Sequence, residues 1–93
     1  MQTPRGLKAA GKRLWRAVTD KFDLDPPELT LLAEGCRMVD LLADLRAEVD
    51  RSGLMVESSQ GIRVNPAAVE ARQLSLALAK LVGSLGLPKG LVK

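Results

Sequence analysis

Residues 25–53, DPPELTLLAEGCRMVDLLADLRAEVDRSG, decide the fold of this chain. Asp25 is a favourable N-cap, Pro26 suits the first helical position, and Glu28 stands three residues after the cap, as in a capping box. Gly53 can adopt the left-handed conformation with which many helices end. The segment therefore predicts a helix over residues 26–52, about 40 Å long at a rise of roughly 1.5 Å per residue.

This helix has two apolar stripes, roughly 120° apart at 3.6 residues per turn. The first stripe consists of Leu31, Met38, Leu42, Leu45 and Val49, and the second of Leu29, Leu32, Cys36, Val39 and Ala43. A surface helix needs only one stripe to face its core. Two explanations are open: the flanking helices cover both stripes, or part of this surface packs against another copy of the chain.

The segments on either side predict two further helices. Residues 6–21 repeat apolar side chains at intervals of seven, four and four, with Trp15 beside them: Leu7, Leu14, Val18 and Phe22. Residues 66–86 follow an Asn65 cap and Pro66 at the first turn, and Gly86 ends them. The last helix carries a heptad seam of Ala67, Ala71, Leu74, Leu78, Leu81 and Leu85.

Between the second and third helices the apolar period changes. Two short runs, 54–57 and 62–64, flank a polar turn at residues 58–61, which predicts a β-hairpin over 54–64. A lone hairpin is marginally stable in water, so we expect it to pack on the helices or on a neighbouring copy.

The sequence thus predicts a mainly α fold. It is a single three-helix domain over residues 1–93, with a basic helix, a long acidic helix, a C-terminal seamed helix, and a short β-hairpin between the second and third helices. We expect about 1–5 and 89–93 to be flexible. Packing in the core or between copies is expected of Trp15, Leu31, Met38, Leu42, Leu45, Leu74, Leu78, Leu81 and Leu85.

The composition argues against catalysis. The chain has no histidine, and its one cysteine, Cys36, falls in an apolar helical pattern typical of a buried thiol. The stretch GLKAAGKR at 6–13 resembles a phosphate-binding loop, but Arg13 replaces the hydroxyl residue and no strand can precede it. We therefore predict no enzyme activity, no cofactor and no metal site. No signal peptide or membrane span is visible, so a soluble intracellular protein is expected.

Charge divides the chain into regions of opposite sign. Residues 1–21 carry six basic side chains against one acidic: Arg5, Lys8, Lys12, Arg13, Arg16 and Lys21. Spaced Lys and Arg suit phosphate contacts, so these six are the predicted DNA-binding residues. Residues 22–51 instead carry eight carboxylates against three arginines. Among them, Asp40, Asp44 and Glu48 are interpreted as a solvated acidic face; docking on a basic helix or binding a metal are the alternatives.

The order of these features resembles that of phage terminase small subunits. The matching segments are KRLWRAVTDKFDLDPPELTLLAEGCRMVDLLADL, then SGLMVESSQGIRVNP, then a seamed helix ending LGLP, which together span about residues 6–88. The resemblance implies a non-enzymatic part of a viral DNA-packaging motor in the host bacterial cytoplasm. Such proteins form homo-oligomeric rings, bind double-stranded viral DNA, and recruit or regulate the terminase large subunit, which carries the ATPase and nuclease.

The resemblance also implies roles for particular residues. Trp15 would anchor the first helix, Asn65 and Pro66 would set the start of the last helix, and the hairpin around 58–61 would lie at a subunit contact or ring edge. The alternative interpretation is a structural or adaptor helical protein that binds a protein partner through its basic N-terminal helix.

Overall fold

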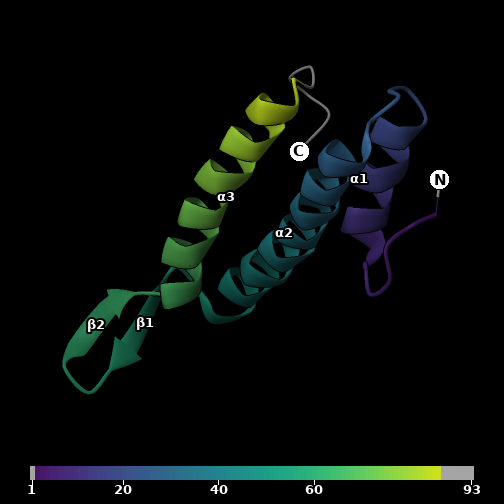
Figure 1. Cartoon of the computed structure of the whole chain (residues 1–93). Helices are drawn as coiled ribbons and strands as arrows, with labels where there is room; N and C mark the ends of the chain where they lie inside the picture. Colours follow the sequence, from purple (N-terminus) through teal and green to yellow (C-terminus); the bar gives the residue numbers. More distant parts are fainter. Residues whose placement is uncertain (1, 87–93) are drawn as a thin grey trace.

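A computed structural model describes residues 2–86 of the chain (Figure 1). Within this range three helices pack against one another: α1 (Ala9–Thr19), α2 (Pro26–Ser52) and α3 (Pro66–Leu85). A hairpin of β1 (Met55–Ser58) and β2 (Gly61–Val64) lies between α2 and α3 in the sequence. The long α2 lies in the middle, with α1 and α3 packed along it. The predicted mainly α fold with an inserted hairpin is confirmed.

The start of α2 has the predicted capping box. The Glu28 N–H donates to the Asp25 carboxylate, and the Asp25 N–H donates to Glu28 Oε1, both at 2.9 Å. These two bonds satisfy N–H groups that a helix start otherwise leaves without acceptors. At the other end Gly53 ends the helix where predicted, but with a φ of +92° and a ψ of 160° and therefore not in the predicted left-handed conformation. Glycine adopts this backbone conformation readily because it has no Cβ.

The first helix is shorter than the predicted 6–21. Gly6 has a φ of +83° and Lys8 is extended, so helical backbone begins only at Ala9. Helix α1 ends at Thr19, followed by a turn at residues 20–21. Leu7 is nevertheless buried, because the extended segment before α1 folds its side chain into the core. The apolar spacing therefore predicted the burial of Leu7 correctly, but the predicted ends of the helix were two to three residues too far out.

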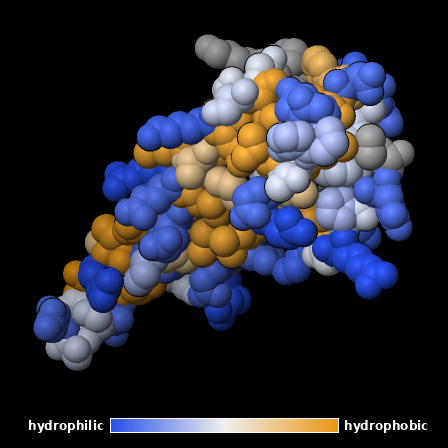
Figure 2. Space-filling view, in the orientation of Figure 1, coloured by the Kyte–Doolittle hydropathy of each residue, from blue (hydrophilic) through white to orange (hydrophobic). Residues whose placement is uncertain are grey.

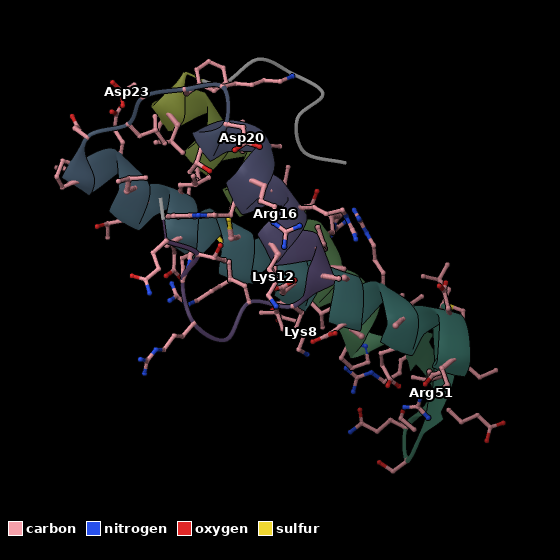
Figure 3. All side chains as sticks on the ribbon, turned by 90° about the vertical axis from the view of Figure 1, so that its right-hand side faces the viewer. Lys8, Lys12, Arg16, Asp20, Asp23 and Arg51 are labelled. Atoms are coloured by element: carbon pink, nitrogen blue, oxygen red, sulfur yellow. The ribbon has the colours of Figure 1, made fainter. Side chains whose placement is uncertain are left out.

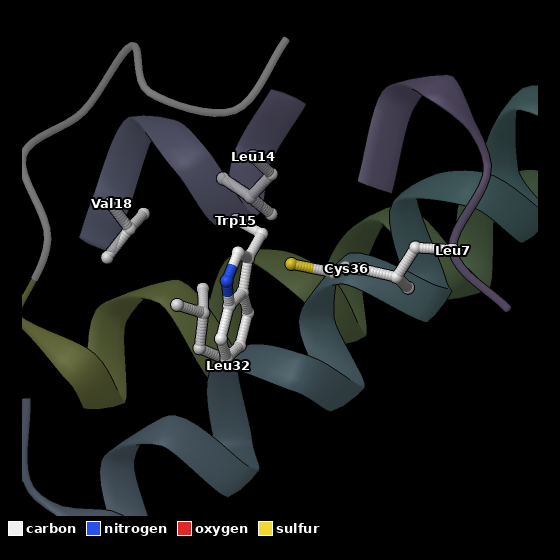
Figure 4. Packing of buried hydrophobic residues seen from close by; sticks show 6 residues of the cluster. All are labelled: Leu7, Leu14, Trp15, Val18, Leu32 and Cys36. Carbon is white, nitrogen blue, oxygen red and sulfur yellow. The ribbon is translucent and has the colours of Figure 1, made fainter. Parts of the chain in front are cut away.

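The main core lies between α1 and α2, where six side chains are buried (Figure 4): Leu7, Leu14, Trp15, Val18, Leu32 and Cys36. Val82 and Leu85 of α3 pack against the same cluster. The second stripe of α2 is thus covered mainly by α1. The Trp15 Nε1–H finds no acceptor among the described residues, so Trp15 contributes through the apolar area of its ring.

Helix α3 covers most of the first stripe of α2. Leu42 and Leu78 are buried there, and Leu78 and Leu81 lie over Gly35 of α2. The remaining predicted packing residues of this layer are half-buried: Met38, Leu45, Leu74, Leu81 and Leu85. Leu31 is different, because it stays 44% exposed and does not belong to the core of this chain.

Asn65 connects the hairpin and the two long helices. Its Oδ1 accepts from the Ala67 N–H at 3.0 Å, which caps α3 as predicted, while its Nδ2 donates to the Gly53 carbonyl at 2.9 Å. Its own N–H donates to the Leu54 carbonyl at 2.7 Å. One buried side chain therefore fixes the end of α2 to the start of α3. Gly86, with a φ of +71°, ends α3, and the predicted flexible segment 89–93 lies outside the described residues.

Candidate nucleic-acid interface

Helix α1, which carries three of the six predicted DNA-binding residues, receives its cap from another helix. Its N-cap residue, Lys8, makes no side-chain cap bond, and the first turn has no acidic residue. Instead, the carboxylate of Asp40 on α2 accepts from the Lys8 N–H and from the Gly11 N–H, each at 2.7 Å. A negative charge at a helix start is favourable both for the free N–H groups and for the helix dipole.

This finding corrects the interpretation of the acidic row on α2. Asp40 is only 7% exposed and is not part of a solvated face. It docks on the basic helix, which was the alternative. A signal for this was present in the sequence, since Asp40 follows Cys36 by one helical turn and therefore lies on the stripe that α1 covers.

Gly11 allows the close approach that this cap requires. A Cβ at position 11 would lie 2.5 Å from Asp40 Oδ2 and 2.7 Å from the Cys36 carbonyl oxygen. Only glycine fits there without displacing α2. The glycine pattern that resembled a phosphate-binding loop therefore has a packing explanation, and its second glycine lies inside a helix.

Lys8 is held at the surface by the next carboxylate of the row. Its Nζ donates to Asp44 Oδ2 at 2.7 Å, and both side chains are more than half exposed. The hydrogen bond to Asp44 and the charge of this carboxylate raise the pKa of Lys8. Further along α2, Glu48 pairs with Arg51, and Arg37 pairs with Glu34 at 3.9 Å. Of the six predicted DNA-binding residues, Lys8 is thus the one that pairs with an acidic side chain among residues 2–86.

The other five predicted residues are exposed: Arg5, Lys12, Arg13, Arg16 and Lys21. No ion pair joins any of them to an acidic side chain within residues 2–86. Lys8, Lys12 and Arg16 follow one side of α1, and Asp20 and Asp23 lie beyond them (Figure 3). We call Lys12, Arg13 and Arg16 the basic face. It is bounded by carboxylates at one end and fixed at the other by Asp40.

Other chemistry is sparse in the described part of the chain. Between residues 2 and 86 no group of three or more His, Cys, Asp or Glu side chains could hold a metal ion. Cys36 is fully buried in the core, and this burial raises the pKa of its thiol to about 12, so it is a poor nucleophile. None of the three helices, over their described residues, is long and apolar enough to cross a membrane.

Comparison with known proteins gives one result. A family model described as phage terminase, small subunit, matches residues 8–88, which include the basic face, all of α2 and the hairpin. Comparisons with curated proteins and with solved structures found no match.

Proposed function

The chain belongs to the phage terminase small-subunit family, and we propose that it serves DNA packaging by binding duplex viral DNA through the basic face of α1. In this proposal it is a non-enzymatic, ring-forming subunit that recruits or regulates the large ATPase and nuclease subunit in the cytoplasm of the infected bacterium. The family supports the packaging role. The surface of α1 supports the choice of DNA-binding residues.

One observation carries the DNA-binding part of the proposal. Lys12, Arg13 and Arg16 are exposed side by side on a helix whose position is fixed by a buried carboxylate, and they have no acidic partner within residues 2–86. A rigid group of unpaired cations can exchange its counterions for phosphates without first breaking internal ion pairs. In an assembly of several copies the same face would be repeated, which raises the affinity for a long polyanion.

Charge reversal on the basic face tests this proposal. The variant Lys12→Glu with Arg16→Glu should weaken duplex binding by at least about tenfold and reduce the slope of log K against log salt by about 2. The matched control is Arg46→Glu with Arg63→Glu, which changes the net charge equally at exposed positions on α2 and β2. Binding is measured by fluorescence anisotropy over a salt series, with the fold checked by circular dichroism.

The outcomes separate two functions. Loss in the basic-face variant but not in the control supports duplex binding through α1. Equal loss in both variants would leave only a nonspecific effect of net charge, and retained binding in both would remove α1 from DNA binding. In the last case the alternative is favoured: an adaptor whose basic face docks on an acidic protein, which is tested by binding the purified large subunit to the same two variants.

A further inference from the structure

The exposed apolar surface of this chain is concentrated on the hairpin. Of seven large hydrophobic side chains that are exposed within the described residues, four belong to the short segment from Leu54 to Val64: Leu54, Met55, Ile62 and Val64. In Figure 2 the hairpin shows apolar surface directly behind its polar tip, at the end of the molecule away from α1. Such a concentration is typical of a surface that packs against a partner.

The strand register places three of these four side chains, those of Met55, Ile62 and Val64, on one face, whereas Leu54 precedes the strand. Met55 pairs with Val64, and Glu57 pairs with Ile62. Directly opposed residues of antiparallel strands lie on the same side of a sheet, and alternate residues share that side. The four residues Met55, Glu57, Ile62 and Val64 therefore form one face, here called the free face. All four are exposed, whereas Val56 and Ser58 on the other side are half-buried.

The other described residues, within 2–86, do not cover this face. The hairpin projects from the junction of α2 and α3 (Figure 1) and is fixed there through Asn65, and the four side chains of its free face are exposed among residues 2–86. The molecule measures 51 × 23 × 20 Å, and its radius of gyration of 15.3 Å exceeds the roughly 12 Å expected for a compact domain of this length. An isolated two-stranded hairpin is marginally stable alone, so a neighbour that packs on it also supports its fold.

Charge selects the surface that can accept the free face. Glu57 lies on the free face, opposite Ile62, so the acceptor must combine an exposed apolar side chain with unpaired positive charge. The outer side of α3 has both: Leu76 is 62% exposed, and Arg72 and Lys80 lie one turn before and after it. Neither cation forms an ion pair within residues 2–86.

The exposed leucines of α2 do not satisfy this requirement. Leu41 lies between Arg37, one turn before it and already paired with Glu34, and Asp44, one turn after it. Leu31 lies three residues from both Glu28 and Glu34. At neither place would the Glu57 carboxylate meet a cation that lacks an acidic partner within residues 2–86, and at both it would approach carboxylates, which opposes docking.

We propose that the free face of one copy packs on the outer side of α3 of a second copy, around Leu76, with the Glu57 carboxylate facing Arg72 and Lys80. The two surfaces are different parts of the same chain, so the contact is heterologous. Each copy then uses its hairpin toward one neighbour and its α3 toward the other, an arrangement that closes into a ring when the rotation allows. This inference rests on the ring-forming part of the proposed function and assigns its interface.

The native mass, measured by light scattering after size exclusion at moderate salt, tests the contact. The wild-type chain should give a defined multiple of 10.0 kDa. Ile62→Asp and Leu76→Asp should each reduce the mass to that of one chain, because each places a charge in the apolar centre of the interface. Leu41→Asp is the matched control, since it adds the same charge at an exposed leucine outside the proposed contact and should leave the mass unchanged.

A charge exchange tests the pairing itself. Glu57→Arg should dissociate the assembly, and combining it with Arg72→Glu and Lys80→Glu should restore the wild-type mass. Dissociation by Ile62→Asp but not by Leu76→Asp would overturn α3 as the acceptor and favour pairing between hairpins. An unchanged mass in both variants would overturn the interface while leaving the ring, and a wild-type monomer would overturn both. DNA binding through α1 is decided separately by the Lys12 and Arg16 variant.

Discussion

The two ends of the molecule differ in how completely the chain itself pairs their polar groups and buries their apolar side chains. At the α1 end, Asp40 accepts the free N–H groups of the helix start and Trp15 is 4% exposed. At the hairpin end, Ile62 is 72% exposed and no other residue between 2 and 86 buries the free face. Both ends contain groups that a protein normally pairs or buries, namely free N–H groups at one end and apolar side chains at the other. Among residues 2–86, these groups are paired or buried at the α1 end and left exposed at the hairpin end.

This difference suggests that the two ends have different functions. The α1 end presents charge, and charged side chains bind phosphates best when the helix that carries them is already fixed, because little ordering remains to oppose binding. The hairpin end presents apolar area, which is stabilised only when another surface removes it from water. Four predictions, from the largest expected effect to the smallest, test whether the ends differ in this way. Chemical unfolding followed by the fluorescence of Trp15, the single tryptophan, measures each of them.

The largest effect is expected from Asp40→Ala. It leaves two N–H groups of the α1 start without their acceptor, and hydrogen bonds to a charged group are worth about 1.5–3 kcal/mol each, so the free energy of unfolding should fall by about 3 kcal/mol. Asp44→Ala is the matched control on the next turn, where the ion pair to Lys8 is exposed, and should change the stability far less. Equal losses would mean that burial of Asp40 contributes nothing.

Gly11→Ala should reduce the free energy of unfolding by about 2 kcal/mol, in spite of the higher helix propensity of alanine. The added Cβ would lie within 2.7 Å of both Asp40 Oδ2 and the Cys36 carbonyl, so α1 and α2 must move apart. Gly83→Ala is the control, since position 83 is also helical and its Cβ would meet nothing within 4 Å. That control should stabilise the chain by up to about 1 kcal/mol; a stable Gly11 variant would contradict the close approach.

The Cys36 thiol should make the stability of the α1 end depend on alkaline pH. Burial raises the pKa of Cys36 from its ordinary 9.0 to about 12 in the folded chain. The unfolded chain therefore loses this proton first, so the stabilisation is complete below pH 9 and declines as the pH rises toward 12, by about 1.4 kcal/mol per pH unit. Stability curves of the wild type and of Cys36→Ala between pH 8 and pH 10 give the measurement. The variant should lack this part of the decline, and parallel curves would contradict the prediction.

The smallest effect on the single chain is expected from Ile62→Ser. An exposed side chain that touches no core contributes little, so the free energy of unfolding should change by less than about 0.5 kcal/mol. The measurement belongs at the lowest protein concentration that fluorescence allows, because association adds stability by mass action. If the free energy of unfolding fell by well over 1 kcal/mol at every protein concentration, Ile62 would be packed within its own chain. The two ends would then not differ in this respect.

Much of the fold could be predicted from local signals. The capping box at Asp25 and Glu28, the Asn65 cap and the glycines after α2 and α3 act over a few residues, so the sequence places the ends of these two helices well. The start of α1 has no such signal. Its cap comes from Asp40, which is 29 residues from Gly11, and a window along the sequence cannot relate the two.

The candidate site was also predicted only in part from the sequence. The sequence alone predicted six DNA-binding residues, which include the three of the basic face, because most of the basic side chains of the first helix lie off its apolar stripe. It could not show that Lys8 pairs with Asp44 while the other five cations have no acidic partner in the described range 2–86, since this depends on which carboxylate α2 brings beside α1.

The sequence by itself therefore determined the mainly α class, the long central helix, the hairpin and the charge of each segment, because these follow from period, caps and composition. Only the tertiary structure decided which stripe of α2 is covered by α1, why position 11 is glycine, what caps α1, and which face of the hairpin stays open. These features depend on the distance between elements far apart in the chain, which is set when their side chains pack together.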